Sequence, residues 1–348
     1  MSEKIKDEAY ITDQHVPISS DPSLEAHYII ETHTFRTFYY TDDEQEQPNV
    51  DTPTNMIQVH IKSAATTRGR SLIIPGTCDS TGIMIWPASY LLCQYLCYTQ
   101  SIQKVDEINF FSLGSKILEL GSGCGIVGCV AALTAKRFRP CRDTFLFYCT
   151  DMDDDVIQLC SENIRRNNLD TTSANDSNIH IAARTLLWGN KVNMISITDE
   201  AGIETFDSVI AADIVYPTTT DEILSLLFQT VNHMLKEGGI FLLSFVSRDG
   251  WKTPQRLIQA ASLAKYKIEF IPYAEFIPVK WKQFLPPLLD ARLLVLRRDE
   301  RAENVNNQLG SDDCLIFPGL KRAMQSSSCG DDNCIVHEEW IAPDCFEE

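Results

Sequence analysis

A glycine-rich stretch near the middle of the chain has the composition of a ligand-binding turn. It reads Glu119-Leu-Gly-Ser-Gly-Cys-Gly125, between an apolar run typical of a strand and an apolar run typical of a helix. Glycine lets a backbone turn tightly and approach a ligand closely, so this context favours a nucleotide-like cofactor over a turn that binds nothing. Gly123, Gly125 and Gly128 also satisfy G-x-G-x-x-G, which leaves a dinucleotide as an alternative.

Two acidic positions bear on which cofactor this turn would hold. Asp151 follows a strand-like run at 144–149, where a carboxylate can accept both hydroxyls of an adenosine ribose, in NAD or in S-adenosylmethionine. The aspartates at 153–155 are typical of a helix start instead. Glu119, two residues before the first glycine, suits a cofactor with a free ammonium and no pyrophosphate. The chain also contains no Tyr-x-x-x-Lys, a common catalytic pair of dehydrogenases, which is mild evidence against NAD.

Further candidates follow the later strand-like runs. Asp213 and Tyr216 come directly after the run at 206–212, so we expect both at the same edge of the sheet as the glycines. An acid and a phenol there could position an amine beside a bound methyl donor; a helix-capping acid and a packing tyrosine are equally consistent. Trp188, in the Leu-Trp-Gly at 187–189, could cover an adenine ring or fill the core.

The elements around these residues alternate between strand and helix patterns. From residue 116 onward this alternation predicts a mostly parallel sheet with helices on both faces, whose ligands bind at the carboxyl ends of the strands. Two runs further upstream predict a β-hairpin at 35–62, and Pro87 suits the first turn of a helix. We expect strands at 35–40, 56–62, 116–120, 144–149, 178–183, 206–212, 240–246, 266–271 and 291–296, and helices after Pro87, after the glycines, at 153–168 and at 221–235.

Composition and charge exclude several classes of protein. The 348 residues are 44% hydrophobic and 22% charged, which permits a sizeable core and excludes disordered and fibrous classes. The net charge of −18 lies in the ends, since residues 1–50 carry −8, residues 299–348 carry −9 and the body only −1. No basic footprint for nucleic acid is present, no run approaches the ~18 apolar residues of a membrane helix, and the N-terminus lacks the apolar region of a secretory signal.

The twelve cysteines favour a reducing compartment. Eight lie in apolar segments of a long chain, so we expect reduced, mostly buried thiols in the cytoplasm or the nucleus. The spacing of Cys329, Cys334, His337 and Cys345 matches no standard zinc motif, and no metal site is expected. We interpret residues 1–27 as a flexible acidic extension, 272–289 as an insertion and 301–348 as an acidic C-terminal tail.

Five motifs together resemble a known family of enzymes. They occur in the family's order over roughly residues 55–298, and they are Ile-Trp86-Pro-Ala, the glycine-rich stretch, Thr-Asp151, Leu-Trp188-Gly and Ala-Ala-Asp213-Ile-Val-Tyr216. The chain resembles the METTL21-like group of class I methyltransferases (methyltransferase family 16), whose characterised members include protein-lysine methyltransferases. It departs from the family pattern at Cys124, where threonine is usual, and in its insertions.

The resemblance implies an α/β, Rossmann-like fold with a seven-stranded, mostly parallel sheet in a domain at 28–300, with its core at 81–298. It implies S-adenosylmethionine as cofactor and methylation of a lysine side chain of a protein, with Asp213 and Tyr216 framing the target nitrogen. No nucleic-acid or membrane partner is expected, and a monomer is favoured. The implied cofactor-binding residues are Trp86, Glu119, Gly121, Gly123, Cys124, Gly125, Asp151, Met152, Trp188 and Ala212.

Three alternatives remain open on the residues alone. The first is a methyltransferase that acts on a small molecule or on another protein nitrogen. The second is a nicotinamide oxidoreductase, against which the Leu-Trp-Gly and Asp-x-x-Tyr elements argue. The third is a non-catalytic, cofactor-binding interaction module, since a scaffold that still binds its cofactor would also keep the glycines and Asp151.

Overall fold

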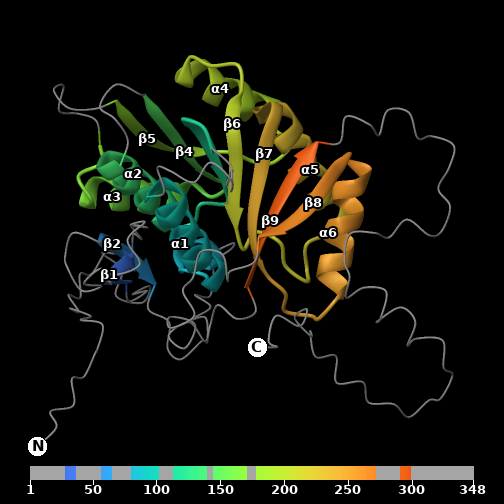
Figure 1. The fold of residues 1–348 in the computed structure, drawn as a ribbon, viewed down its shortest axis with the longest axis horizontal. Helices are drawn as coiled ribbons and strands as arrows, with labels where there is room; N and C mark the ends of the chain where they lie inside the picture. Colours follow the sequence, from blue (N-terminus) through green and yellow to red (C-terminus); the bar gives the residue numbers. More distant parts are fainter. Residues whose placement is uncertain are drawn as a thin grey trace, which may run out of the picture.

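One seven-stranded sheet forms the centre of the molecule. The computed structural model describes residues 28–36, 56–64, 80–101, 113–138, 144–170, 178–271 and 291–298. Within them the strand order is β5-β4-β3-β6-β7-β9-β8, parallel from β5 to β7, with β9 antiparallel to both of its neighbours (Figure 1). The strands are β3 Lys116–Leu120, β4 Phe145–Asp151, β5 Ile179–Thr185, β6 Phe206–Ala212, β7 Leu235–Val246, β8 Tyr266–Ile271 and β9 Ala291–Arg298. The predicted fold class is confirmed.

Two layers of helices cover the sheet, one on each face. The strand side chains that alternate to one face pack with the first three helices, and those that alternate to the other face pack with the last three. The first layer holds α1 Pro87–Ser101, α2 Ile126–Phe138 and α3 Asp154–Arg166. The second layer holds α4 Lys191–Ala201, α5 Asp221–Met234 and α6 Lys252–Leu263. No helix in the described ranges is long and apolar enough to cross a bilayer.

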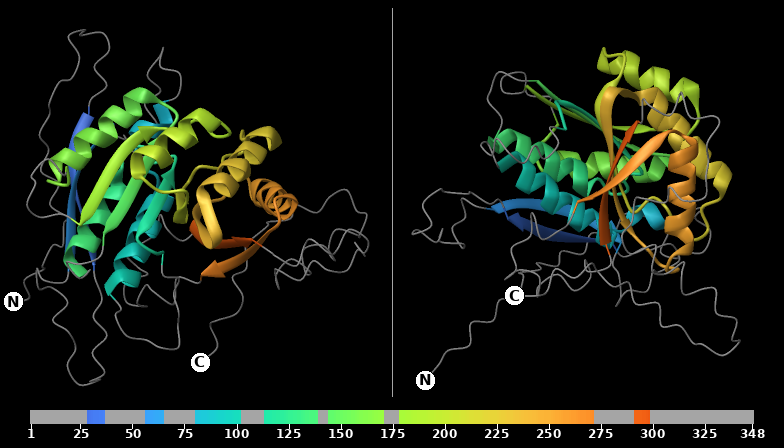
Figure 2. Two further views of the ribbon diagram at one scale, coloured as in Figure 1. Left: turned by 90° about the horizontal axis from the view of Figure 1, so that it is seen from above. Right: turned by 45° about the vertical axis from the view of Figure 1, so that its right-hand side comes forward.

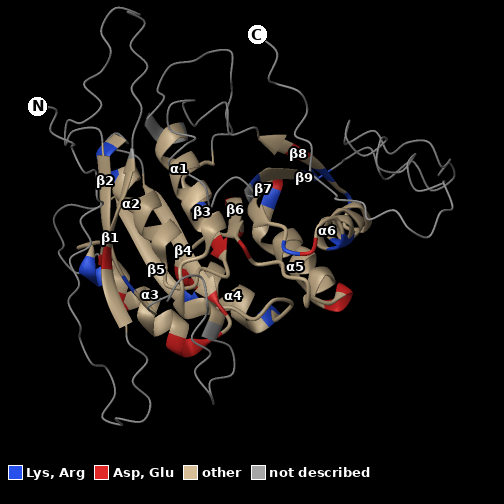
Figure 3. Ribbon diagram, turned by 90° about the horizontal axis from the view of Figure 1, so that it is seen from below, with Lys and Arg blue, Asp and Glu red and all other residues tan. Residues whose placement is uncertain are grey.

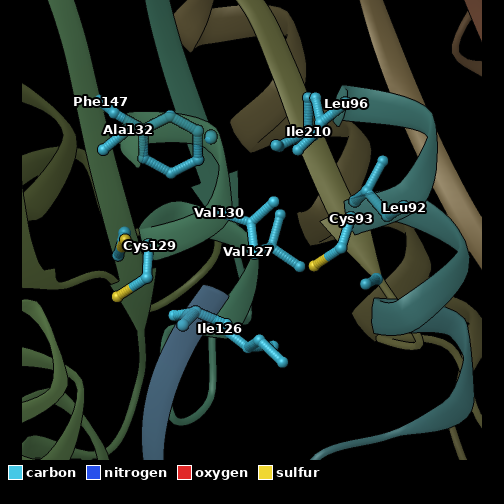
Figure 4. Close-up of a cluster of buried hydrophobic side chains, with 14 of the residues drawn as sticks. Leu92, Cys93, Leu96, Ile126, Val127, Cys129, Val130, Ala132, Phe147 and Ile210 are labelled. Atoms are coloured by element: carbon cyan, nitrogen blue, oxygen red, sulfur yellow. The ribbon is translucent and has the colours of Figure 1, made fainter. Parts of the chain in front are cut away.

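The core beneath α1 and α2 fixes the end of the glycine-rich turn. In Figure 4 Cys93 of α1 points toward Val127 of α2, and Leu96 of α1 lies beside Ile210 of β6. All four side chains are at most 1% exposed. Because α2 begins directly after the glycines, its packing against α1 and the sheet holds the turn at the carboxyl end of β3.

The N-terminal hairpin docks onto the outside of the first helical layer, as Figure 2 shows. It consists of β1 Tyr28–Arg36 and the antiparallel β2 Met56–Ala64. Asn163 of α3 and Asn167, which caps the C-terminus of this helix, pair with the backbone of β2 much as another strand would. Asn163 accepts from the Lys62 amide at 2.8 Å and donates to the Lys62 carbonyl at 2.9 Å. Asn167 does the same for His60, at 2.9 and 2.8 Å.

The prediction of the first strand at 35–40 was wrong in its bounds. The structure begins β1 seven residues earlier, because all nine residues of β2 find antiparallel partners between Tyr28 and Arg36. The aromatic run that suggested the later strand continues into residues 37–40, which lie outside the described residues. The extension at 1–27, the insertion at 272–289 and the tail at 301–348 lie there as well.

Most other element predictions are confirmed, and two helices were missed. The strands at 206–212 and 266–271 have the predicted bounds. The α4 helix was not predicted because it buries only Met194 and Ile197 and has no continuous apolar stripe. The α6 helix was missed for a similar reason: few of its residues are buried, and a proline lies in its first turn.

Candidate functional site

The glycine-rich turn requires glycine at three positions. Gly121, Gly123 and Gly125 have φ of 62°, 54° and 83°, a region that side-chain-bearing residues rarely adopt. Packing adds a second reason, since a Cβ at Gly123 would lie 2.9 Å from the carbonyl oxygen of Gly82, and one at Gly125 would lie 2.5 Å from the sulfur of Cys160. The turn is therefore fixed between the 3₁₀ turn η3 Ser80–Ile83 and α3.

Hydrogen bonds tie this turn to the end of β4. The Ser122 amide donates to the Thr150 carbonyl at 2.8 Å, and the Thr150 hydroxyl donates to the Glu119 carbonyl at 2.6 Å. The Gly123 amide donates to Asp151 Oδ2 at 3.1 Å. The turn and the Asp151 carboxylate consequently form one rigid unit at the carboxyl ends of β3 and β4.

The Asp151 carboxylate is oriented and partly exposed at the end of β4. Its Oδ1 accepts from the Met152 amide at 2.8 Å, and burial raises its pKa although the backbone amides of Gly123, Asp153 and Met152 act in the opposite direction. An ionised carboxylate offers about four acceptor sites. The backbone amides leave acceptor capacity for ligand hydroxyls, so Asp151 fits the predicted role of holding a ribose.

The Glu119 carboxyl lies deeper than its predicted role suggested. Its side chain is 1% exposed on the α2 side of β3, beside Cys149 and the Gly128 amide, and burial raises its pKa to about 8. Its Oε2 has no hydrogen-bond partner among the described residues. A buried acceptor without a donor is costly, so this oxygen fits a cationic donor such as the ammonium of S-adenosylmethionine.

The Trp86 segment covers the turn from the other side. The Trp86 indole donates to the Thr81 carbonyl at 2.9 Å, which holds the ring against η3. Pro87 begins α1 as predicted, and the Ala88 carbonyl accepts from the Ser244 hydroxyl of β7 at 2.8 Å. The Trp-Pro-Ala motif thereby bridges the glycine-rich turn and the end of β7.

The remaining residues of the predicted cofactor set differ in accessibility. Trp188 is half-buried against the second helical layer, while Met152 is 58% exposed beside Asp151. Ala212, at the end of β6, and Cys124 are both buried. Burial raises the pKa of the Cys124 thiol to about 12, and its carbonyl accepts from Asn163 at 2.8 Å, so this cysteine contributes backbone and packing to the turn.

Asp213 is paired with an arginine that the sequence reasoning missed. Its side chain is 0% exposed, and its two oxygens accept from Arg248 Nη1 at 2.9 Å and Nη2 at 2.6 Å. The guanidinium carbon lies 5.0 Å from the ring centroid of Trp86 and 5.7 Å from that of Tyr216. Arg248 comes directly after β7, at the edge where the other candidates lie. Its place after a strand could have marked it as a candidate in the sequence.

All these side chains meet at the carboxyl edge of the parallel strands. Figure 3 looks at the molecule from below and shows acidic segments around the ends of β3, β4 and β6. No cluster suited to a metal ion occurs within the described part of the chain, and the cysteines and histidine at 329–345 lie outside it. The edge therefore combines a glycine turn with the Asp151 carboxylate on one side and a cluster of aromatic rings with an ion pair on the other.

The topology is that of a Rossmann-like, class I methyltransferase. Residues 71–259 match the family model described as lysine methyltransferase, which is more than half of the chain. The protein belongs to that family, as the sequence motifs predicted.

Similar proteins cover part of the chain. Protein N-lysine methyltransferase METTL21A of Xenopus tropicalis is 29% identical over 46% of this chain, and protein-lysine N-methyltransferase EFM6 of Saccharomyces cerevisiae is 32% identical over 39%. The matches span 59% and 52% of those relatives. Among solved structures, an O-methyltransferase family protein from Burkholderia thailandensis has a TM-score of 0.40 at 12% identity, over 61% of this chain and 57% of that one.

Proposed function

We propose that this protein is an S-adenosylmethionine-dependent N-methyltransferase that methylates a lysine side chain of a protein. The observation that carries the proposal is the Asp151 carboxylate, held by the Gly123 and Met152 amides at the end of β4. Its position beside a glycine turn fits an adenosine ribose. The printed names of the two relatives, both protein-lysine methyltransferases, support lysine over other nitrogens.

The cofactor would lie along the carboxyl ends of β3 and β4. The glycine-rich turn would approach its methionine end, with Glu119 Oε2 available to the ammonium, and Asp151 would hold the ribose. Met152 and Trp188 offer apolar surface for the adenine. When bound, S-adenosylmethionine supplies a methyl group on a positively charged sulfur.

The chain's own residues would then select and orient an amine. Transfer needs a neutral nitrogen, whereas a free lysine has a pKa of ~10.4. The rings of Trp86 and Tyr216, whose centroids lie 6.2 Å apart, would confine the amine, and the positive charge of the bound cofactor beside it would favour its neutral form. Alignment of the nucleophile with the methyl group is the main remaining requirement, and rigid walls at the edge of the sheet supply it.

The compartment proposed is the cytoplasm or the nucleus. Six cysteines among the described residues are free and buried, and burial raises the pKa of several of their thiols. Such thiols are inert packing groups and agree with a reducing environment.

Calorimetric titration with S-adenosylmethionine and, separately, with NAD tests the cofactor. We expect binding of the first and none of the second. Asp151→Asn removes a charged acceptor, so its dissociation constant for S-adenosylmethionine should rise on the order of 10- to 100-fold. Asp155→Asn, the same change at an exposed position of the first turn of α3, should bind like the unaltered protein. Binding of NAD, or equal affinities for the two variants, would overturn the cofactor assignment.

Transfer of a labelled methyl group to proteins of a cell lysate tests the reaction. Amino-acid analysis of the labelled product should give methyllysine, and Asp151→Asn should lower the yield while Asp155→Asn should not. Label in another amino acid or in a small amine would refute lysine as the target. Cofactor binding without any transfer would favour the non-catalytic interaction module.

A further inference from the structure

A complete cation site lies at the carboxyl edge of the sheet, and a side chain of the protein itself fills it. The site has an acidic floor, Asp213, and two aromatic walls, Trp86 and Tyr216. A carboxylate combined with aromatic faces is the arrangement that binds organic cations such as ammonium and guanidinium groups. The occupant is the guanidinium of Arg248.

The floor of this site is fully buried, and Arg248 occupies both of its oxygens. The Asp213 side chain is 0% exposed, and both of its oxygens already accept from the guanidinium. The backbone of Asp213 is fixed as well, in a left-handed conformation with φ of 59° and with its amide donating to the Ser244 carbonyl at 2.8 Å. A second cation can therefore approach the carboxylate only after Arg248 has left it.

The Arg248 side chain is partly exposed, and besides the ion pair it donates from Nη1 to the Val246 carbonyl at 3.3 Å. Its side chain is 27% exposed, on the short connection between β7 and α6. The next residue, Asp249, accepts from the Thr253 amide at 3.1 Å and from the Thr253 hydroxyl at 2.7 Å, which anchors the start of α6 independently. Rotation of one arginine side chain toward solvent would open the site.

We propose that this cage of Trp86, Tyr216 and Asp213 receives the cationic end of the substrate lysine, and that Arg248 is an internal competitor that the lysine displaces. The proposal deepens the proposed function and rests on it. Arg248 thereby determines specificity: a free amine competes poorly with a tethered guanidinium, whereas a lysine on a protein has further contacts to drive the exchange. Once displaced, Arg248 no longer neutralises Asp213. With cofactor bound, its positive charge would favour loss of the lysine proton to solvent, and the carboxylate could then orient the neutral amine as the sequence motif predicted.

The exchange has a measurable consequence for binding. A site that is open for only a fraction of the time binds its ligand more weakly by that fraction, so removing the competitor should tighten binding on the order of 10- to 100-fold. Arg248→Gln removes the cation but keeps an amide that can donate to Asp213, which avoids a buried carboxylate without any partner. Arg248→Lys is the second variant, because an ammonium lacks the paired donors that hold both oxygens.

The test is calorimetric titration with n-butylammonium, which reproduces the end of a lysine side chain, in the absence of cofactor. We expect tight binding to Arg248→Gln, intermediate binding to Arg248→Lys and weak binding to the unaltered protein. The matched control is Arg184→Gln, because Arg184 also pairs with an acidic residue, Glu200, and lies on β5 at the far edge of the sheet from the cage. Near-ultraviolet circular dichroism verifies that each variant is folded. Equal affinities for all four proteins would overturn the proposal.

Labelled methyl transfer to n-butylamine separates this inference from the proposed function. Tighter binding to Arg248→Gln together with faster methylation of n-butylamine supports both. Tighter binding without methylation of any amine or protein supports the competitor and overturns the methyltransferase. Methylation of lysate proteins by the unaltered chain, with no gain in n-butylammonium binding in either variant, leaves the proposed function standing and overturns the role of Arg248.

Discussion

Replacement of Glu119 by glutamine should change how the stability of the protein depends on pH. Burial raises the pKa of this carboxyl from 4.5 to about 8. Between those values the folded protein keeps a proton that the unfolded chain releases. The contribution of the protonated Glu119 carboxyl to the free energy of unfolding is therefore fully present below pH 4.5 and is lost as the pH rises through about 8.

The shift fixes the size of the effect. One pKa unit corresponds to about 1.4 kcal/mol, so the ionised carboxyl should cost on the order of 4 kcal/mol in its 1% exposed site. Glutamine does not ionise. Between about pH 5 and about pH 9 the unaltered protein should therefore lose about 4 kcal/mol of unfolding free energy relative to the Glu119→Gln variant.

Urea denaturation at a series of pH values, with a reducing agent present, measures this difference. Glu269→Gln, the same change at an exposed position of β8, should show almost no such movement. Parallel stability curves for Glu119→Gln and the unaltered protein would refute the reasoning, since the carboxyl would then titrate alike in both states. If the cofactor ammonium pairs with Glu119, saturating S-adenosylmethionine should also flatten the curve of the unaltered protein.

Two further substitutions test the supports of the site. Asn163→Ala removes three buried hydrogen bonds to Lys62 and Cys124, so it should lower the free energy of unfolding, measured by urea denaturation, by about 2–4 kcal/mol. The control Gln158→Ala, on the exposed side of α3, should lower it by about 0.5 kcal/mol or less. Equal losses would contradict the docking of the hairpin through Asn163. Gly128→Ala places a Cβ 2.3 Å from the Cys149 sulfur, so it should lower the free energy of unfolding by about 1–3 kcal/mol. The loss should be clearly smaller in a Cys149→Ala background, where the sulfur is absent. Strictly additive losses would show that the two residues are not in contact.

Local patterns were sufficient to predict that the glycine-rich turn and Asp151 lie together. The strand, the glycines and the helix are consecutive in the chain, and Asp151 follows directly after the next strand. Parallel strands bring their carboxyl ends to one edge, so the proximity of the turn and Asp151 followed from the order of the elements alone. The structure adds the bond that joins them, from the Gly123 amide to Asp151.

Long-range contacts decided the rest. Arg248 and Asp213 are 35 residues apart, and Lys62 and Asn163 are 101 apart, so no local period or spacing reports either contact. The depth of Glu119 likewise depends on how α1 and α2 pack over β3, which its spacing from the glycines does not encode.

The sequence by itself thus determined the kind of protein, because alternating strands and helices and a glycine turn are written in consecutive residues. Only the tertiary structure decided what surrounds the place proposed for the target amine. There Trp86, the Asp213–Tyr216 segment and Arg248 come from three separate parts of the chain and meet at one edge of the sheet. Their meeting depends on packing between distant elements, which the chain settles only when it folds.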